Sequence, residues 1–488
     1  MKRAQITVFM SLLLPLFLGV LGAVLDSAYQ QVIRSRIQRS LTLCEYSLLS
    51  EYQADLWERY GLFFLDSAYG DRQESEQKVQ TRLLTYLKGN LSWRDGEARG
   101  AFTPFQTAVC ELETRDFSRA TDGKGQVFYE QAVAFEQDLW GASLLPEWLD
   151  CTENARNLEE QENSFQDADQ RERDNLEVLR QRRREEEEED TEDPTAEMIQ
   201  ERESSLLAMV VAETDHMSSR AVSLDKVPSV RPLLEGCGPA GHISPGVIND
   251  QWFHTYLLER CANAREALQQ EREGEWLAYE LEYILVGKDS DRENLEGVVK
   301  RLLLLREGVN YAYLLTDSKK QAEAFALAAV VAGLTLMPEL VDALKQVILL
   351  TWAYGESILD VRGLLQGNQI ALVKTGESWK LPLTKLFTLR SHVSEYDNRT
   401  DAGGLKYEGY LRLLLTVTGR DKKCMRALDI MEGNLRATEQ GRYLYMDQCI
   451  DGLTVRAEFS ATSLFSGFAG RSGGVHQMTA ERRFLYEW

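Results

Sequence analysis

The first pattern along the chain is an apolar stretch from Ile6 to Leu25 in which no residue carries a charge. A helix over these 20 residues would rise about 30 Å, which matches the hydrocarbon thickness of a bilayer. Lys2 and Arg3 precede the stretch, and Asp26 follows it. The pattern therefore predicts a helix that crosses a membrane once. The anchor positions that we single out are Ile6, Phe9, Pro15, Gly19, Ala23 and Leu25.

Two other interpretations of this stretch remain open. It could be a cleaved secretory signal, with Leu21-Gly22-Ala23 as a weak cleavage site, although the apolar region of a signal is usually about 7–15 residues long. It could also be a buried helix of a soluble domain, although such a helix normally has a polar face. Lys2 and Arg3 favour an N-terminus inside the cell, and long soluble domains cross the membrane largely regardless of later charges. We expect the remainder of the chain to lie outside the cytoplasm.

The apolar pattern continues beyond Asp26 as a stripe on one helix face. Its members follow one another at steps of three or four residues, the spacing of one face of an α-helix. They are Tyr29, Ile33, Ile37, Leu41, Cys44, Leu48, Tyr52 and Leu56. One helix from about Gln5 to Tyr60, with Gly61 as its C-cap, is the prediction. Its second half should serve as a stalk against which a domain packs, with Cys44 as a small core residue.

The segment ITVFMSLLLPLFLGVLGAVLD resembles the N-terminal helix of type IV pilins and their relatives. It is similar in particular to the TadE/TadG-like minor pilins of tight-adherence (Tad) pili. Those proteins carry a comparable run with a proline about midway and an acidic residue at its end, which here are Pro15 and Asp26. Positions 5 to 10 depart from many pilins because they read QITVFM and contain no glutamate. The resemblance implies a sheet packed on the long helix.

The next part of the chain alternates short helical and strand patterns. A short apolar run, a loop, a helix, a strand, a glycine-rich turn and a further helix are predicted in that order. Their ranges are Leu62–Leu65, Asp66–Asp71, Arg72–Lys88, Thr107–Phe117, Asp122–Gly125 and Gln126–Trp140.

A highly charged segment begins at about Thr152 and ends near Glu203. It holds the basic run Arg180–Arg184, followed by the acidic run Glu185–Asp190. Its apolar residues are too sparse for a coiled-coil seam; they are Leu158, Phe165, Leu176 and Leu179. The composition predicts a solvated helix or a disordered linker. Cation binding by the acidic run and attachment to a cell-wall polymer through the basic run are the functional alternatives.

The remainder of the chain returns to a globular composition and is predicted to be rich in helices. The predicted helices are one capped by Asn249 or Asp250 and ending at Leu268, one through Val298, Leu302, Leu305 and Val309, and the ranges Ser318–Gly333, Pro338–Gly367, Tyr407–Thr418 and Asp421–Ala437. The apolar ranges Phe325–Met337 and Leu340–Tyr354 within them are too short or too charged to span a membrane and should be core helices. The predicted strands are Leu277–Tyr283, Ile370–Lys374, Leu453–Ser460 and Arg482–Trp488.

A second resemblance rests on YELEYILVGKDSDRENLEGVVKRLLLLREGVN and the later LLTWAYGESILDVRGLLQG. These stretches resemble an uncharacterised family of secreted or membrane-anchored proteins of Gram-positive bacteria, whose members often accompany Tad pilus components and share YGLFFLD, here Tyr60–Asp66. The resemblance brings no catalytic residue with it. The positions that carry the motif are Tyr279, Glu280, Glu282, Tyr283, Gly287, Lys288, Asn294, Arg306, Trp352, Glu356 and Asp360.

Charge and cysteine content exclude some classes of protein. The formal net charge of −22 argues against a nucleic-acid partner, which requires a basic surface. The seven cysteines are scattered with no Cys-x-x-Cys pair, so a structural zinc site has little support. Disulfides are permitted outside the cytoplasm, but their connectivity stays open.

Few residues offer catalytic chemistry. Glu356 and Asp360 are four apart on one helix face and could form a glycosidase-like or metal-binding pair, a solvent-exposed face, or a link to Arg362 or a neighbouring loop. The same alternatives, a catalytic or metal-binding pair or a structural role, apply to Glu280 and Glu282. Gly470–Gly474 matches a nucleophile elbow, yet His476 is the only histidine after it, so a flexible loop is the better interpretation. The five histidines are isolated in the sequence.

The sequence therefore predicts an α+β protein on one N-terminal membrane helix. The predicted parts are an anchor and stalk helix (1–60), a first α/β part (61–151), the charged linker (152–203) and a helix-rich core (204–488). We expect a structural role as a minor pilin-like or accessory component of a Tad-type pilus, with membrane lipid and pilus or pseudopilin subunits as partners and without nucleic acid, cofactor or metal. The alternative is a membrane-anchored envelope enzyme or ligand-binding module that acts without a pilus.

Overall fold

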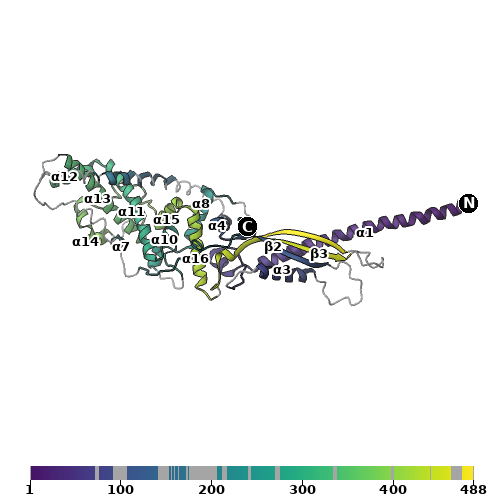
Figure 1. The fold of residues 1–488 in the computed structure, drawn as a ribbon. Helices are drawn as coiled ribbons and strands as arrows, with labels where there is room; N and C mark the ends of the chain where they lie inside the picture. The colour runs from purple at the N-terminus through teal and green to yellow at the C-terminus, as the bar shows by residue number, and fades with distance from the viewer. Residues whose placement is uncertain are drawn as a thin grey trace. The chain divides into compact units, whose positions relative to one another are not determined.

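The structure is a computed structural model of the whole chain (Figure 1). It describes residues 2–486 except the ranges 72–75, 92–106, 141–152, 172–173, 175–205, 212–216, 240–242, 270–274, 333–337, 397–399 and 463–474 and the single positions 155, 159, 163 and 440. The Arg/Glu-rich runs of the predicted linker, Cys151, His216, His242 and the Gly470–Gly474 motif fall outside the described residues. The architecture is α+β with a helix-rich half, as predicted.

The chain divides into two compact units, each built from separate stretches. Unit 1 combines residues 1–131, 232–242 and 438–488, and unit 2 combines residues 132–231 and 243–437. The domains predicted from the sequence are consecutive ranges, whereas in the structure both ends of the chain belong to the same unit.

Unit 1 is organised around the helix α1 (Lys2–Leu49), which contains Pro15 without interruption. The side chains described from Phe9 to Leu25 are almost all exposed. Among the described residues, α1 is the one helix long and apolar enough to cross a membrane, by length and composition. The predicted single helix to Tyr60 is wrong in one respect. The chain leaves the helix after Leu49 and resumes it in α2 (Ala54–Tyr60), which ends at Gly61 in the left-handed conformation, as predicted.

Within the described residues, a four-stranded antiparallel sheet completes unit 1. β3 (Cys449–Thr462) is its centre: β2 (Thr107–Arg119) pairs along one edge, and β4 (Val475–Leu485) and the short β1 (Leu65–Asp66) pair along the other. The predicted strands near 107–117, 453–460 and 482–488 all fall in this sheet, although β4 begins seven residues earlier than expected and ends at Leu485. The remaining elements of unit 1 are α3 (Glu76–Leu91), the start of α4 (Asp122–Trp140) and the 3-10 helix η4 (Met446–Gln448).

The predicted stripe of α1 forms the core of unit 1. Ile33, Ile37, Leu41 and Leu48 are at most 2% exposed, and Cys44 is buried beside them. They pack with α3 against one face of the sheet, to which β3 contributes every second residue: Leu453, Val455, Ala457, Phe459 and Ala461. Leu56 is buried in α2, and Tyr52 is half-buried between the two helices. The alternation of buried residues along β3 is the pattern of a strand with one buried face. Figure 1 shows α1 and α3 along the sheet and the N-terminal half of α1 extending beyond it.

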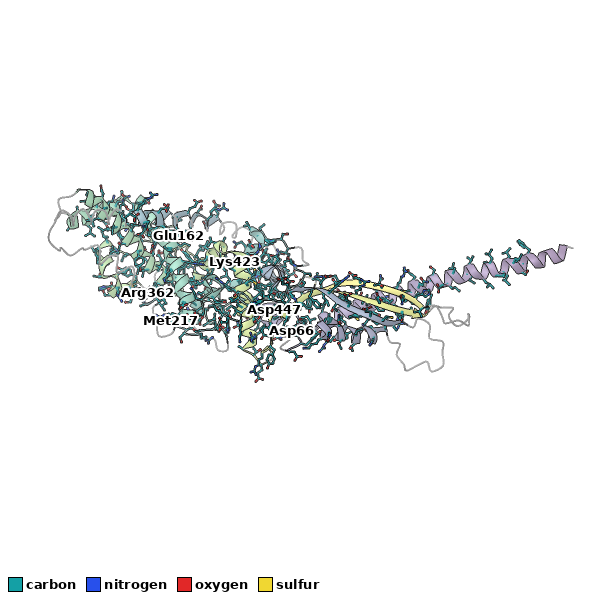
Figure 2. The ribbon with its side chains drawn as sticks, viewed as in Figure 1. Asp66, Glu162, Met217, Arg362, Lys423 and Asp447 are labelled. Carbon is teal, nitrogen blue, oxygen red and sulfur yellow. The ribbon has the colours of Figure 1, made fainter. Side chains whose placement is uncertain are left out.

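Asp66 and Asp122 fix two irregular segments of unit 1. Asp66, labelled in Figure 2, accepts the backbone N–H groups of Ala68 and Gly70 at 2.9 and 2.7 Å. The Asp122 carboxylate accepts the N–H groups of Gly236 and Gly238 at 2.9 and 3.0 Å, which ties residues 232–239 to this unit. The predicted turn at Asp122–Gly125 is present, since residues 123–125 lie at positive φ before α4 continues.

Unit 2 is helical. Its longest helices, α11 (Asp291–Thr316) and α13 (Pro338–Leu365), pack against each other, and α12 (Ser318–Ala332) packs on α13. All three match the predicted helices. The other elements are the end of α4, α7 (Leu206–Val210), α8 (Val247–Arg260), α9 (Ala264–Gln269), α10 (Glu280–Val286), η2 (Leu383–Thr388), α14 (Leu389–His392), η3 (Val393–Tyr396), α15 (Tyr407–Val417) and α16 (Arg420–Arg436).

Four local predictions in unit 2 are wrong. Leu277–Tyr283 is not a strand, because α10 begins at Glu280. This helix is buried on all sides, so the alternation of apolar and polar residues does not mark one buried face. Ile370–Lys374 makes only one bridge, between Ile370 and Leu405. The helix predicted to end at Leu268 is divided into α8 and α9, and its N-cap is Gly246 rather than Asn249 or Asp250. In α12, Phe325 and Val330 are exposed, so this helix is only partly a core helix.

Two residues of the predicted linker are part of the core of unit 2. Leu158 and Phe165 lie on described helical turns and are 6% and 2% exposed. The Phe165 ring meets Tyr311 of α11 edge to face with centroids 5.7 Å apart. A Cβ at Gly308 would lie 2.9 Å from the backbone of Gln161, so glycine permits this close approach. This part of the predicted linker therefore packs on α11.

Candidate functional site

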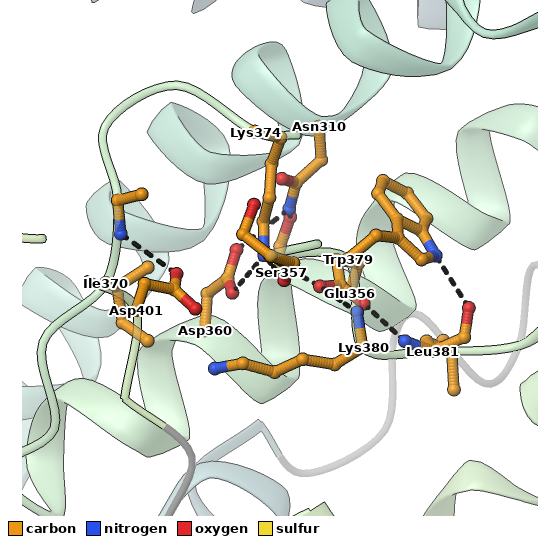
Figure 3. A network of polar contacts seen from close by, with 12 residues as sticks. Asn310, Glu356, Ser357, Asp360, Ile370, Lys374, Trp379, Lys380, Leu381 and Asp401 are labelled. Carbon is orange, nitrogen blue, oxygen red and sulfur yellow. Dashed lines mark hydrogen bonds and ion pairs between the residues drawn. The ribbon is translucent and has the colours of Figure 1, made fainter. Parts of the chain in front are cut away.

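The most unusual feature of unit 2 is a group of buried charges between α11 and α13 (Figure 3), here called the charge cluster. Its members are Arg306, Asn310, Glu356, Ser357, Asp360 and Lys374. Arg306 and Asn310 stand one turn apart on α11, and Glu356 and Asp360 stand one turn apart on α13. Lys374 comes from the loop after α13 and reaches between the two carboxylates.

Lys374 bridges both acids of the charge cluster. Its Nζ donates to Glu356 Oε1 and to Asp360 Oδ1, each at 2.7 Å, and the three side chains are 0% exposed. The third proton of the ammonium group is directed to the backbone oxygen of Ser378 at 3.2 Å. The predicted link from Glu356 and Asp360 to a neighbouring loop is therefore present. Arg362, labelled in Figure 2, donates instead to the Met209 carbonyl of α7 at 3.1 Å.

The other oxygen of Asp360 is surrounded by donors. Arg306 Nε and Nη2 lie 3.0 and 2.9 Å from Oδ2, and Asn310 Nδ2 lies 3.1 Å from it. Arg306 also donates through Nη1 to Tyr410 at 3.1 Å and to the Ala371 carbonyl at 2.9 Å. Charge-assisted bonds of this kind are the strong ones in a dry interior.

Glu356 holds the loop that carries Lys374. Its carboxylate accepts the backbone N–H groups of Lys380 and Leu381 at 2.9 and 2.7 Å. The indole N–H groups of Trp352 and Trp379 both donate to the Leu381 carbonyl, and the two rings meet edge to face at 5.4 Å. Trp352, a motif residue, therefore contributes by fixing the loop and covering the charges.

The two acids of the charge cluster have opposite pKa shifts. Burial alone would raise the pKa of Asp360, but Lys374 and Arg306 lower it to about 2. Burial raises the pKa of Glu356, and Lys374 offsets only part of that effect. Burial would lower the pKa of Lys374, but Asp360 and Glu356 raise it. Asp360 is therefore the carboxylate that stays ionised, and Glu356 is the member of the pair that can carry a proton more readily.

The geometry does not favour the glycosidase-like or metal-binding interpretation of Glu356 and Asp360. The position between the carboxylates, where a cation would bind, is occupied by the Lys374 ammonium group. Within the part of the chain that the structure describes, no group of three or more His, Cys, Asp or Glu residues is arranged to hold a metal ion. Full burial also keeps a soluble substrate away from these carboxylates.

Most of the other motif residues form a second network around α10. Glu280 accepts from the Ala262 N–H at 2.7 Å and from Asn434 Nδ2 at 2.6 Å. Glu282 accepts from the Ala264 N–H at 2.9 Å and from the Tyr407 hydroxyl at 2.7 Å. Burial raises the pKa of Glu282 to about 7. These carboxylates accept backbone N–H groups of the turn between α8 and α9, so their role is to hold that turn in place.

The tyrosines and the turn of the motif act in the same way. Tyr279 accepts the Ser218 N–H at 2.9 Å, and Tyr283 donates to Asp429 at 2.8 Å. Asn294 pairs with both backbone groups of Lys288, whose side chain is exposed. Gly287 ends α10 at φ +77°, and a Cβ there would lie 2.5 Å from the Arg426 guanidinium. Glycine is therefore favoured at this position by its backbone conformation, and an added Cβ would also displace the Arg426 guanidinium.

A cavity of about 350 Å³ opens beside α16 in unit 2. Leucine and valine side chains line it together with Arg301, Lys422 and Arg426. Burial and the nearby Arg301 are among the causes that lower the pKa of Arg426, with burial the larger. No sequence pattern pointed to this cavity.

The sequence identified about half of the charge cluster. Arg306, Glu356 and Asp360 were singled out, and the structure brings them together; Trp352, also singled out, binds the adjacent loop. Lys374 and Tyr410 were missed because each is an isolated residue in a loop or helix with no neighbouring pattern. Asn310 could have been found, since it follows Arg306 by one helical turn on the same face. His254, predicted to be isolated, is a buried residue whose Nε2 lies 2.6 Å from Lys423 Nζ.

Comparison with known proteins assigns the chain to a family. No curated protein matches the chain, and no solved structure matches it. A model described as "Family of unknown function (DUF5702)" matches residues 184–461, more than half of the chain. The matched range contains every motif position from Tyr279 to Asp360 and leaves out α1. The chain is therefore a member of the DUF5702 family of unknown function.

Proposed function

We propose that this protein is a single-pass, membrane-anchored surface protein with a structural role, as a minor pilin-like or accessory component of a Tad-type pilus. In this proposal residues 6–25 lie in the membrane or in a filament, the N-terminus is inside the cell, and both units lie outside the cytoplasm. The observation that carries the proposal is the change in the surroundings of α1 along its length. From Phe9 to Leu25 the helix is exposed and apolar, and from Tyr29 its stripe is buried in unit 1.

The exposed apolar half of α1 requires an apolar environment. Large side chains such as Leu12, Leu16 and Phe17 are 71%, 67% and 62% exposed. Exposed apolar surface of this extent is typical of a membrane span or an interaction surface. Because every backbone group of a helix is satisfied internally, α1 is suited to lipid.

A pilin-like role is supported by how unit 1 is built. A long N-terminal helix lies along one face of an antiparallel sheet, which is the arrangement that the resemblance to pilins implies. The stalk part of α1 also keeps apolar residues on its outer face, since Val32, Leu43 and Tyr46 are 49%, 53% and 69% exposed. These three residues share one helix face by their spacing. Such a face is suited to packing against the helices of other subunits.

Topology can be tested with the cysteines that the chain already has. Cys110 and Cys237 are exposed in unit 1, whereas Cys44 is buried there. A membrane-impermeant maleimide added to intact cells should modify Cys110 and Cys237 and spare Cys44. Modification of the exposed pair only after lysis would place unit 1 in the cytoplasm and overturn the proposed orientation.

Anchoring can be tested by one substitution inside the span. Leu18→Arg should release a large share of the protein from the membrane fraction, because arginine at the centre of a span costs about 2.5–3.5 kcal/mol on insertion scales. Gly19→Ala is the control, since nothing lies within 4 Å of the added methyl group. If the mature chain begins after Ala23, the stretch is a cleaved signal rather than an anchor.

The pilus role needs a separate test, because anchoring alone does not require it. Chemical cross-linking in cells that produce a Tad pilus, followed by purification of the full-length protein, should recover pilus subunits. Tyr46→Ser with Val32→Ser should reduce that recovery without changing membrane retention. If no pilus component is recovered, the protein acts independently of a pilus, and the cavity beside α16 then favours a ligand-binding module.

A further inference from the structure

We propose that the charge cluster is the site of an intramolecular amide bond, formed between Nζ of Lys374 and Cγ of Asp360 with the loss of one water molecule. The bond would join the loop after α13 to α13 itself. It is a modification of unit 2, and it is independent of whether the protein is a pilus component or lies in a membrane.

The two groups that would react are already in contact. Nζ of Lys374 lies 2.7 Å from Oδ1 of Asp360, one bond away from the carbon that would be attacked. Both side chains are 0% exposed, and Arg306, Asn310 and Ser357 close around them. Two reactants held in contact by a rigid framework react as if at an effective concentration of roughly 10⁵–10⁸ M. Condensation is thereby favoured over the reverse reaction with water.

Hydrogen-bond donors surround the other oxygen of Asp360. Oδ2 of Asp360 accepts two bonds from Arg306 and one from Asn310, all between 2.9 and 3.1 Å. When Nζ adds to Cγ, the negative charge of the tetrahedral intermediate develops on Oδ2. Fixed donors aimed at such an oxygen are the main means of stabilising this intermediate. After reaction the same donors would bind the amide carbonyl.

Glu356 is positioned to carry protons during the reaction. Its Oε1 is 2.7 Å from the same Nζ. Glu356 takes one proton from the ammonium group, which leaves a neutral amine, and passes it to Oδ1 as Nζ adds to Cγ. Glu356 then takes a second proton from nitrogen and gives it to the Oδ1 hydroxyl, and this group leaves as water. The third proton stays on the amide nitrogen, and Glu356 ends as the carboxylate that it was at the start.

The charge balance of the cluster also favours the product. Lys374 and Arg306 carry two positive charges, and Glu356 and Asp360 carry two negative charges. Condensation removes one charge of each sign and leaves Arg306 with Glu356. Buried ions are expensive because they have lost their hydration, whereas a neutral amide with hydrogen-bond partners is not.

The mass of the purified full-length protein tests this proposal directly. The wild-type chain should be lighter than its sequence by one water molecule. Trypsin should give a branched peptide in which residues 346–362 are joined to residues 363–380 through Asp360 and Lys374, since an acylated Lys374 is not cleaved. A full mass and a free Lys374 in the folded protein would overturn the proposal, and the cluster would then be an ion pair. This measurement requires no variant to fold.

Variants identify the bond by its two partners. Lys374→Arg keeps the charge but cannot form the amide, so its mass should be the full value. Lys380→Arg is the matched control, because Lys380 lies in the same loop and is not directed between the two acids (Figure 3), and it should keep the deficit. Glu356→Gln should slow bond formation, so that freshly made protein retains the full mass for longer. A deficit that persists in Lys374→Arg would assign the lost water to another pair of residues.

Discussion

Replacing Ile33 with alanine tests whether the stripe of α1 holds unit 1 together. Ile33 is 0% exposed and belongs to the core formed by α1, α3 and one face of the sheet. Truncating a buried isoleucine leaves a cavity and typically costs 2–5 kcal/mol, so we expect a loss of about 3 kcal/mol for this position. The neighbouring Val32 is 49% exposed, and Val32→Ala should change stability by less than about 0.5 kcal/mol.

The buried cysteines make the measurement specific to each unit. Cys44 and Cys449 lie in unit 1 and Cys424 lies in unit 2, and all three are at most 1% exposed. Cys44 is 1% exposed, so it reacts with a maleimide only when unit 1 opens, and burial also raises the pKa of its thiol to about 11. A loss of about 3 kcal/mol corresponds to a rate of Cys44 modification about 150-fold higher, at 1.36 kcal/mol for each tenfold change.

The assay is modification of the detergent-solubilised chain followed by peptide mass spectrometry. In Ile33→Ala, Cys44 and Cys449 should react faster while Cys424 keeps its rate. Val32→Ala should leave all three rates unchanged. Equal effects of the two substitutions on Cys44 would refute the assignment of the buried face.

Three further predictions concern unit 2. Burial and Glu259 raise the pKa of Glu136 to about 7. The free energy of unfolding should therefore fall as pH rises from about 4.5, where the acid ionises in the unfolded chain, to about 7, where it ionises in the folded chain. Glu136→Gln should raise the free energy of unfolding by at most about 3 kcal/mol above pH 7 and leave it unchanged below pH 4.5, as measured by urea unfolding at both pH values. Gly287→Ala should lower the urea midpoint more than Gly403→Ala, because both residues have positive φ but only Gly287 faces Arg426; equal shifts would exclude the steric contribution. Trp352→Phe removes the N–H that binds the Leu381 carbonyl and should cost about 1 kcal/mol, whereas Trp352→Ala should cost about 3–5 kcal/mol in the same unfolding measurement.

Local patterns predicted much of this fold because each depends on residues close in the sequence. The uncharged stretch after Arg3, the stripe from Tyr29 and the helices α11, α12 and α13 were all predicted from periodicity. A helix repeats every 3.6 residues and forms its hydrogen bonds within four, so its pattern is recorded locally.

The same rules failed where an element is buried on all sides. Around Tyr279 the alternation of apolar and polar residues predicted a strand, but α10 also buries its polar positions, Glu280 and Glu282, against specific donors. A polar residue with a buried partner looks like a surface residue in the sequence, and only the tertiary structure supplies the partner.

Local patterns were enough to indicate an N-terminal helix suited to a membrane, a stripe on this helix that must be covered, and a second half built from long helices. The strand that covers the stripe became known only from the folded chain, in which β3 fills this role and pairs with β1 and β2. The tertiary structure likewise decided that Lys374 lies between Glu356 and Asp360. The physical reason is the same in both cases: strand pairing and buried ion pairs join residues by distance in space, and nothing in the local sequence records which distant residue will be the partner.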